Sequence, residues 1–236
     1  MRACRWRLLY WNELMPLKPF SLQVGEELLL RYPALAPLSS PIVRAVEIIC
    51  DSHRAGGRLL VCGNGGSAAD AEHIVGELVK GFVLRRAIGP KDRERLQQSG
   101  CDDWREIAEK LQGGVAAMSL TGPSALTTAI ANDVAAEMVF AQQVYVHGRQ
   151  GDVLLGLSSS GNSKNVLAAL KVARAFGLTT LGLTGSQPSR MGGLCDVIIP
   201  VPATETFKIQ ELHLPIYHAI CLMIERELFS ETPPEL

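Results

Sequence analysis

A histidine and a glutamate stand one helical turn apart, directly after a glycine-rich turn. The turn is Cys62-Gly63-Asn64-Gly65-Gly66-Ser67, which follows an apolar run and precedes a segment rich in helix formers. Glycines let the backbone approach a ligand closely, and a helix N-terminus offers free N–H groups and a positive dipole end. His73 and Glu77 can face the same pocket because they are four residues apart. The pattern predicts acid–base or metal chemistry on a phosphorylated small molecule.

A second polar run has the sequence Ser158-Ser159-Ser160-Gly161-Asn162-Ser163-Lys164-Asn165. It follows an apolar run and opens a predicted helix, so its hydroxyl and N–H groups can bind an anion. The alternative is that the serines only cap the helix and fill a turn. One N-cap needs one serine rather than four, which favours a phosphate site. Ligands of open α/β sheets bind at the carboxyl ends of strands, where Ser67 and this run both fall.

Two further polar groups occur later in the chain. The pair Asn132-Asp133 can bind sugar hydroxyls, although spacing alone favours an ordinary N-cap for a helix over Val134–His147. Gln210 and His218 belong to a long predicted helix over Phe207–Phe229, in which Glu211 and His213 point another way. Pro215 is expected to kink that helix, either as a tolerated bend or to aim Gln210 and His218 at a common point.

Short apolar runs alternate with helical periodicity along most of the chain. This alternation predicts one parallel sheet with helices on both faces, an α/β fold. Two amphipathic helices are expected ahead of the first strand, over Leu22–Arg31 and Ile42–Arg54, and Val166–Phe176 is expected to be a helix after the third. The expected strands are Leu59–Cys62, Val115–Leu120, Val153–Leu157, Thr179–Leu183 and Val197–Val201.

The segment Leu84–Gly114 is highly charged and has no long apolar run. We expect a solvent-facing excursion with a short helix near Trp104–Gln112, either a plain solvated face or a lid or oligomer contact. Neither a repeat nor a low-complexity linker divides the chain. We therefore expect one domain over residues 21–236, after a flexible extension over residues 1–20.

Composition narrows the functional class. The chain has 236 residues, 47% of them hydrophobic, with a net charge of −1, so neither a nucleic-acid nor a membrane partner is indicated. The apolar start of the chain is too short for a membrane span and makes a poor signal peptide. The six cysteines form no CxxC pair and mostly lie in apolar runs, which is typical of buried thiols in a reducing cytoplasm.

Taken together, these motifs resemble the sugar isomerase (SIS) domain family, and within it the phosphoheptose isomerases. The resemblance covers about Glu27 to Phe229 and rests on GNGGS, on DAxH with a glutamate one turn later, on SSSGNSKN, on Asn132-Asp133 and on IQExH with a further histidine. It implies a flavodoxin-like three-layer α/β/α sandwich around a five-stranded parallel sheet, with N-terminal helices added. It also implies a homotetramer with active sites between subunits. Leu84–Gly114 is longer than the corresponding link in typical family members.

The resemblance assigns roles to single residues. It implies substrate contacts from the glycine turn, from the serine run, from Gln210 and from the Asn-Asp pair, namely Asn64, Gly65, Gly66, Ser67, Asn132, Asp133, Ser158, Ser159, Ser160, Ser163 and Gln210. It implies a zinc-associated set of His73, Glu77, Gln210 and His218. Ketose–aldose interconversion moves a proton between adjacent carbons through an enediol(ate). Our hypothesis makes Glu77 the base and His218 the acid.

The expected reaction converts sedoheptulose 7-phosphate to D-glycero-D-manno-heptose 7-phosphate, a precursor of activated heptose. Isomerisation of another phosphosugar remains open, because we expect the charged insert to border the pocket. A third reading is a non-catalytic phosphosugar-binding tetramer that organises a partner. The presence of both Glu77 and His218 speaks against it, since a pure binding module needs neither base nor acid.

Overall fold

The computed structural model describes residues 17–231, which contain a five-stranded sheet in the order β2-β1-β3-β4-β5. All four strand pairings are parallel, and Leu59 and Val153 begin a register that runs to Cys62 and Gly156. The strands are β1 Leu59–Cys62, β2 Ala117–Ser119, β3 Val153–Leu157, β4 Thr179–Thr184 and β5 Val197–Pro200. Each one lies within or beside an apolar run predicted to be a strand, so the expected parallel α/β sheet is confirmed.

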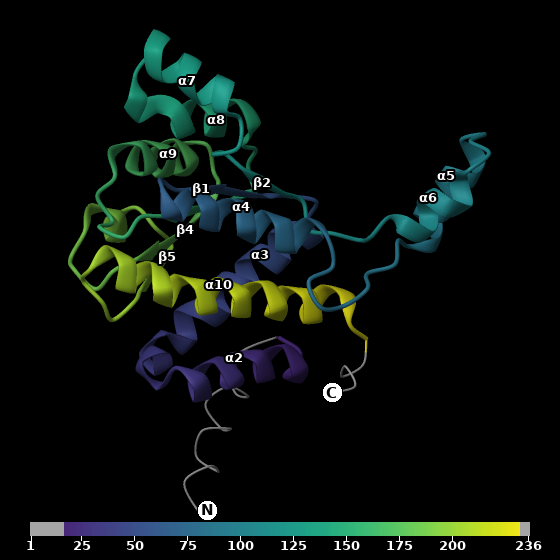
Figure 1. The fold of residues 1–236 in the computed structure, drawn as a ribbon, viewed down its shortest axis with the longest axis horizontal. Helices are drawn as coiled ribbons and strands as arrows, with labels where there is room; N and C mark the ends of the chain where they lie inside the picture. The colour runs from purple at the N-terminus through teal and green to yellow at the C-terminus, as the bar shows by residue number, and fades with distance from the viewer. Residues whose placement is uncertain (1–16, 232–236) are drawn as a thin grey trace, which may run out of the picture.

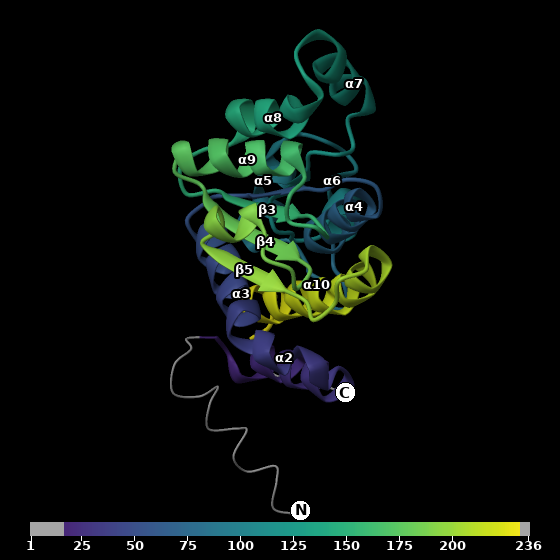
Figure 2. The ribbon, with the colours of Figure 1, turned by 90° about the vertical axis from the view of Figure 1, so that its left-hand side faces the viewer.

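Helices cover both faces of this sheet (Figures 1 and 2). One face carries α3, α4 and α10, with α2 packed outside against α10, and the other carries α8 and α9 with α7 beyond them. The helices are α2 Pro19–Arg31, α3 Ser39–Arg54, α4 Gly66–Val79, α7 Ser124–Asp133, α8 Val139–His147, α9 Lys164–Ala175 and α10 Thr206–Phe229. The three layers form the predicted α/β/α sandwich, with helices added at the N-terminal side.

Two hydrophobic cores lie on the two faces, and alternate residues of the strands supply them. In β1, Leu59 and Val61 join the core beneath α3, α4 and α10, whereas Leu60 and Cys62 join the core beneath α8 and α9. Successive strand side chains point to opposite faces, so a strand buried on both sides must be apolar throughout. This explains why the strand runs read as continuous hydrophobic stretches.

Most of the expected N-terminal extension, residues 1–16, lies outside the described residues. Residues 17–20 belong to the folded unit, because Leu17 is buried and Lys18 is tied to the far end of the chain. The Lys18 backbone N–H donates to Glu227 Oε2 at 2.8 Å, and its Nζ donates to the Glu227 and Ser230 carbonyl oxygens. The helix α2 therefore begins at Pro19, three residues before the expected start.

One stretch, Pro33–Arg54, is long and apolar enough to cross a membrane by length and composition, and half of its most apolar window is buried inside the protein. Its helix α3 supplies Ile42, Val46 and Ile49 to the core. A core helix of a water-soluble fold passes the same test, so this stretch is weak support for a membrane span.

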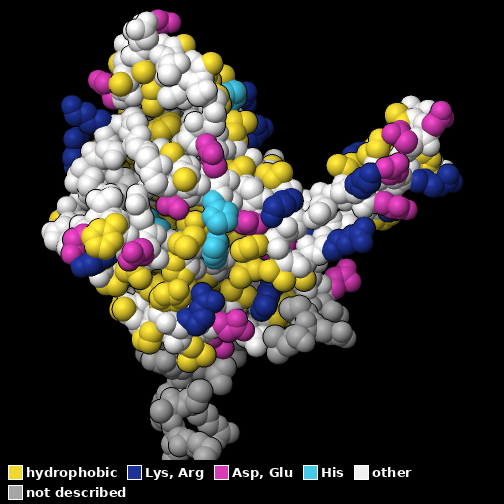
Figure 3. Space-filling view, in the orientation of Figure 1, with side chains coloured by type: hydrophobic (Ala, Val, Ile, Leu, Met, Phe, Trp, Pro, Cys, Tyr) yellow, Lys and Arg dark blue, Asp and Glu magenta, His cyan; other side chains and the backbone are white. Residues whose placement is uncertain are grey.

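The charged insert projects from the body as two short helices (Figure 1). They are α5 Pro90–Gln98 and α6 Trp104–Lys110, and they contact each other. The predicted helix near Trp104 is confirmed, whereas α5 was not predicted. Side chains of both charges gather on this arm (Figure 3), and α5 buries none of its residues. The insert is the solvent-facing excursion that its composition indicates.

The last helix, α10, continues through Pro215, so the proline does not end it. It buries His213 completely, with Nε2 3.4 Å from the Thr184 carbonyl oxygen and Nδ1 without a partner. Burial lowers the pKa of His213 from 6.5 to about 4. The folded protein therefore holds this ring neutral at pH values where the unfolded chain would protonate it.

This buried histidine predicts acid sensitivity. Below pH 6.5 the unfolded chain takes up a proton at His213, and the folded protein does not until about pH 4, so the free energy of unfolding falls as pH drops through this window. Over that window the loss from this group amounts to about 3 kcal/mol. We expect His213→Leu to flatten the pH dependence by about 2 kcal/mol between pH 7.0 and 4.5, measured by urea unfolding, because pH 4.5 lies above the folded pKa and captures part of the window. Parallel pH profiles of the variant and the wild-type protein would contradict the assignment.

Candidate active site

The candidate site lies where the chain reverses its direction of travel across the sheet. The first crossover leads from β1 to the edge strand β2, and the later ones lead from β3 to β4 and β5 on the other side. Ligands of open α/β sheets bind at such a switch point, outside the carboxyl ends of the strands. The glycine turn follows β1 and the serine run follows β3, and these strands are neighbours. The fold thus brings together two motifs that are about 95 residues apart in the sequence.

The glycine turn has a shape that requires its glycines. Gly65 has a φ of 55°, which residues with a side chain rarely adopt, and it precedes the first residue of α4. A Cβ on Gly66 would lie 2.7 Å from Gln210 Nε2, so the absence of a side chain lets Gln210 rest on the turn. Asn64 exchanges two amide hydrogen bonds of 2.9 and 2.8 Å with Asn165. This reciprocal pair joins the glycine turn to the start of α9.

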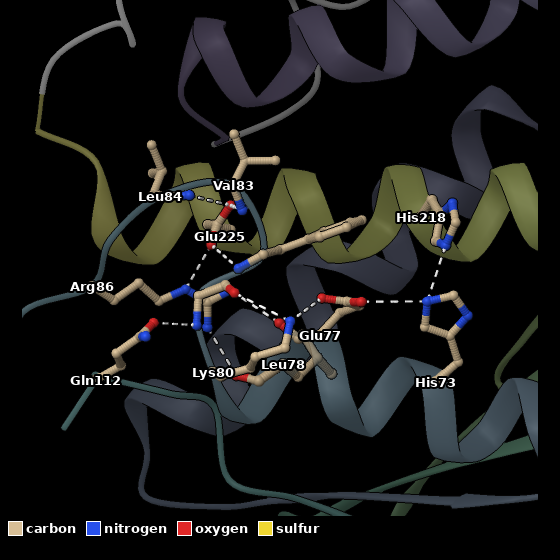
Figure 4. Close-up of polar contacts among 12 residues, drawn as sticks. His73, Glu77, Leu78, Lys80, Val83, Leu84, Arg86, Gln112, His218 and Glu225 are labelled. Carbon is tan, nitrogen blue, oxygen red and sulfur yellow. Dashed lines mark hydrogen bonds and ion pairs between the residues drawn. The ribbon is translucent and has the colours of Figure 1, made fainter. Parts of the chain in front are cut away.

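His73, Glu77 and His218 come together between α4 and α10 (Figure 4). His73 Nε2 lies 3.3 Å from Glu77 Oε1 and 3.4 Å from His218 Nε2. The Glu77 side chain is 14% exposed and that of His73 is 42% exposed, so a ligand can reach the cluster from solvent. Histidine side chains come to the surface beside hydrophobic ones on this face of the molecule (Figure 3). A cavity of about 130 Å³ between α2 and α10 adjoins His218.

Two groups that sequence reasoning did not assign complete this cluster. The Tyr217 hydroxyl lies 3.0 Å from His73 Nδ1 and donates to Asp70 Oδ1 at 3.2 Å. Burial raises the pKa of Tyr217, and the Asp70 carboxylate raises it further, so the phenol keeps its proton. Burial also raises the pKa of Asp70. Asp70 stands three residues before His73 on α4, and that spacing was the one signal available in the sequence.

The electrostatics at His218 favour a neutral ring. Burial lowers its pKa from 6.5, and the neighbouring His73 lowers it further, against the opposing effect of Glu77. A neutral imidazole has one ring nitrogen with a lone pair, which can ligate a metal, and one N–H, which can donate a hydrogen bond. The arrangement therefore suits a ligand role for His218 better than the role of a charged general acid.

The donor set has the chemistry of a zinc site. Zinc accepts imidazole nitrogen and carboxylate oxygen at about 2.0–2.2 Å, which places the ligands of a tetrahedral ion about 3.3 Å apart. The two separations that share His73 Nε2 match this edge. Within residues 17–231, no group of three or more His, Cys, Asp or Glu side chains is arranged to hold a metal ion as it stands. The fit rests on these two donor pairs alone. Gln210 of α10 lies against Gly66, and its ligand role stays a prediction.

The serine run forms a compact loop after β3. Ser158 is buried, and its Oγ lies 2.9 Å from Ser163 Oγ, while Ser160 is exposed and accepts the Asn162 N–H at 3.2 Å. Gly161 has a φ of 62°, and a Cβ there would lie 2.3 Å from Ser189 Oγ. The loop leads into α9 at Lys164, so hydroxyls and free helix N–H groups share one place.

Asn132 and Asp133 lie apart from these groups. They end α7 instead of capping the next helix, so the N-cap interpretation is wrong: α8 begins only at Val139, after a separate 3-10 turn. Both are exposed, and Asn132 Nδ2 donates to Asp133 Oδ1 at 2.8 Å. In the described part of the chain they make no hydrogen bond to the glycine turn, the serine run or the histidine cluster. Their substrate role stays a prediction.

A buried ion pair supports the end of α4, and sequence reasoning missed it. Arg86 Nε donates to Glu225 Oε1 at 2.8 Å, and their side chains are 0% and 1% exposed (Figure 4). Arg86 also donates to the carbonyl oxygens of Leu78 and Glu77. Glu225 further accepts three backbone N–H groups, those of Phe82, Val83 and Leu84. The network fixes the last turn of α4, which carries Glu77, against α10.

Comparison with known proteins agrees with this geometry. The model of the SIS domain family matches residues 31–99 and 104–185, and the interruption falls inside the insert. The chain therefore belongs to the SIS-domain family of sugar isomerases.

Relatives place it more closely. The chain is 38% identical to the phosphoheptose isomerase of Rhodospirillum rubrum, over 83% of this chain and 90% of that one. It is 40% identical to the phosphoheptose isomerase of Burkholderia pseudomallei, over 80% of this chain and 83% of that one. It resembles the solved phosphoheptose isomerase of Neisseria gonorrhoeae, with 33% identity and a TM-score of 0.66, and the match covers 87% of this chain and 92% of that one. The solved phosphoheptose isomerase of Francisella tularensis is 26% identical, with a TM-score of 0.65, and the match covers 96% of this chain and 100% of that one. Within the SIS-domain proteins, the chain is a member of the phosphoheptose isomerase family.

Proposed function

We propose that this enzyme interconverts sedoheptulose 7-phosphate and D-glycero-D-manno-heptose 7-phosphate through an enediol(ate). The observation that carries the proposal is the meeting of His73, Glu77 and His218 beside two anion-binding turns at the switch point of the sheet. The curated relatives named phosphoheptose isomerase support the choice of substrate. The loop of Ser158 and Ser160 would bind the phosphate, and the histidine cluster would face the carbons that react.

Each residue near the cluster has a proposed task. Glu77 Oε1 faces His73 and its Oε2 accepts from Lys80 at 2.6 Å, so the carboxylate is held in one orientation. A carboxylate so placed can take the carbon-bound proton from one carbon and return it to the next. The one N–H of neutral His218 would serve the sugar oxygen as the proton donor, while its other ring nitrogen would hold the metal. Gln210, resting on Gly66, is placed to donate a hydrogen bond to a sugar oxygen near the turn.

The proposed site holds zinc through His73, Glu77, Gln210 and His218. Bound there, zinc would act as a Lewis acid toward negative charge that develops on the sugar oxygen. Protein purified without chelator is expected to carry close to one zinc per chain by metal analysis. We would abandon the metal if the content is under about 0.1 equivalent and added zinc does not raise turnover.

The proposed assembly is a homotetramer in the cytoplasm. The support is the family, together with exposed apolar side chains around α10 and α2, among them Phe207 and Leu30. A tetramer would place the mass in solution at four times 25.5 kDa, which light scattering after size exclusion measures.

Removing one hydroxyl from the serine loop tests the phosphate site. Ser160→Ala should weaken binding of a sugar phosphate by ~1.5–3 kcal/mol, because it removes a hydrogen bond to a charged group. Stability should change little, since Ser160 is exposed and accepts one backbone N–H. Calorimetric titration gives the affinity, and Ser99→Ala, an exposed serine in the insert, is the matched control. Equal losses of stability and binding would favour a loop that only shapes a turn.

The decisive assay supplies sedoheptulose 7-phosphate and follows the aldoheptose phosphate by NMR, with and without added zinc. Product formation supports the proposal. Thermal stabilisation by the sugar phosphate without product would favour the non-catalytic binding module instead. Absence of both would exclude this substrate and direct the assay to other ketose phosphates.

A further inference from the structure

One buried phenol joins α4 and α10 at the cluster of His73, Glu77 and His218. Tyr217 of α10 is 2% exposed, and its oxygen lies between His73 Nδ1, at 3.0 Å, and Asp70 Oδ1, at 3.2 Å. Asp70 and His73 are three residues apart on α4, so they are neighbours on one face of that helix. The three side chains form a single line of hydrogen bonds that ends at the nitrogen of His73 opposite to the one facing Glu77.

With Asp70 ionised, counting protons along this line sets the direction of each hydrogen bond. A phenol carries one proton, and an ionised carboxylate can only accept. Tyr217 donates to Asp70, so the remaining contact requires His73 Nδ1–H to donate to the phenol oxygen. In a neutral ring the lone pair then lies on Nε2, where a cation held between Nε2, Glu77 and His218 would use it. Without that cation the Glu77 carboxylate competes, because it can itself accept from Nε2–H.

We propose that Tyr217 and Asp70 are positioning residues that hold His73 as the Nδ1–H tautomer and present its Nε2 lone pair to the metal. The proposal rests on the zinc site of the proposed function. Ligating histidines commonly donate their second N–H to such a partner, and loss of that partner lowers metal affinity by 10–100-fold. Here the partner is a tyrosine from a second helix, which also fixes the ring angle.

Packing and burial agree with an orienting task. The Tyr217 ring meets His73 edge-on at 5.5 Å between centroids and His218 edge-on at 5.0 Å. Asp70 Oδ2 is buried without a hydrogen-bond partner, and among the described residues the Asp70 side chain accepts one hydrogen bond, from Tyr217. Keeping a carboxylate half-buried costs free energy, and the hydrogen bond from Tyr217 offsets part of that cost.

The test uses Tyr217→Phe, which keeps the ring and removes only the oxygen. Tyr145→Phe, a remote and exposed tyrosine packed on Phe176, is the matched control. Zinc affinity is measured by competition with a chromophoric chelator. The His73 tautomer is measured separately on metal-free protein with 15N-labelled histidine that carries Glu77→Gln, which removes the competing carboxylate. In this background His73→Gln identifies the signal among the five histidines.

In the metal-free Glu77→Gln background we expect the Nδ1–H tautomer at His73 both with Tyr217 intact and with Tyr145→Phe added, and we expect Tyr217→Phe to lose that preference. With Glu77 present, Tyr217→Phe should bind zinc 10–100-fold more weakly than the wild-type protein. An Nε2–H tautomer in the Glu77→Gln background with Tyr217 intact, which would result if Asp70 carried the proton and Tyr217 donated to His73, overturns the proposal. Unchanged zinc affinity in Tyr217→Phe also overturns it. If the wild-type protein binds no zinc, the metal part of the proposed function fails, and the NMR result alone then decides whether the relay sets the tautomer.

Discussion

Glu77→Gln is expected to lower kcat by about 10²–10⁴-fold while the folded assembly persists. Glutamine has nearly the same shape but cannot accept a proton from carbon, and a positioned acid or base typically contributes a factor of this size. Glu77 is the one carboxylate within the described residues that faces His73 Nε2, at 3.3 Å. The measurement is turnover of sedoheptulose 7-phosphate at saturating substrate, with protein that elutes at the wild-type volume.

A loss of zinc could produce the same drop, so the assay needs a second reading. Metal content of the Glu77→Gln variant is measured on the same sample, and turnover is repeated with excess zinc. A matched control is Glu72→Gln, an exposed carboxylate on α4 that accepts from Thr121 at 3.1 Å instead of facing the histidines. Normal turnover in Glu77→Gln at normal assembly would refute the base assignment.

Glu225→Gln is expected to lower the free energy of unfolding by about 3–5 kcal/mol. Removing one partner of a fully buried ion pair leaves the other charge uncompensated, and Arg86 and Glu225 are buried to 0% and 1% exposure. The amide also cannot accept all four hydrogen bonds that the carboxylate accepts. Urea unfolding of both proteins at pH 7 gives the difference.

The contrast with an exposed ion pair makes this prediction specific. Asp51→Asn removes the partner of Arg54 at 3.1 Å, where both side chains are about half exposed or more, and such pairs contribute about 0.2–1 kcal/mol. A comparable loss of unfolding free energy in Glu225→Gln and Asp51→Asn would show that the buried network stabilises the protein no more than an exposed ion pair does. Because Arg86 also holds the carbonyl oxygens of Glu77 and Leu78, we expect Glu225→Gln to reduce turnover as well.

The sequence predicts the strands well because their signal is local. Each strand is a short apolar run, and burial on both faces of a parallel sheet demands such a run. The run Val115–Leu120 is longer than β2, Ala117–Ser119, because β2 is an edge strand that pairs only with β1. The helix α5 gives no such signal: it buries no side chain, so no hydrophobic periodicity marks it.

The glycine turn, the serine run and the pair His73–Glu77 could be found from the sequence, because each is a short motif whose chemistry depends on neighbours in the chain. Only the tertiary structure shows that Tyr217 meets His73 across 144 residues, that Arg86 meets Glu225 across 139, and that Asn132 and Asp133 end a helix apart from the cluster. The order of strands decides these contacts, since it sets which strand ends are adjacent and which helices share a face. Local periodicity carries no information about that order. The sequence therefore predicts which residues can do chemistry, but it does not predict the long-range contacts that hold them in place.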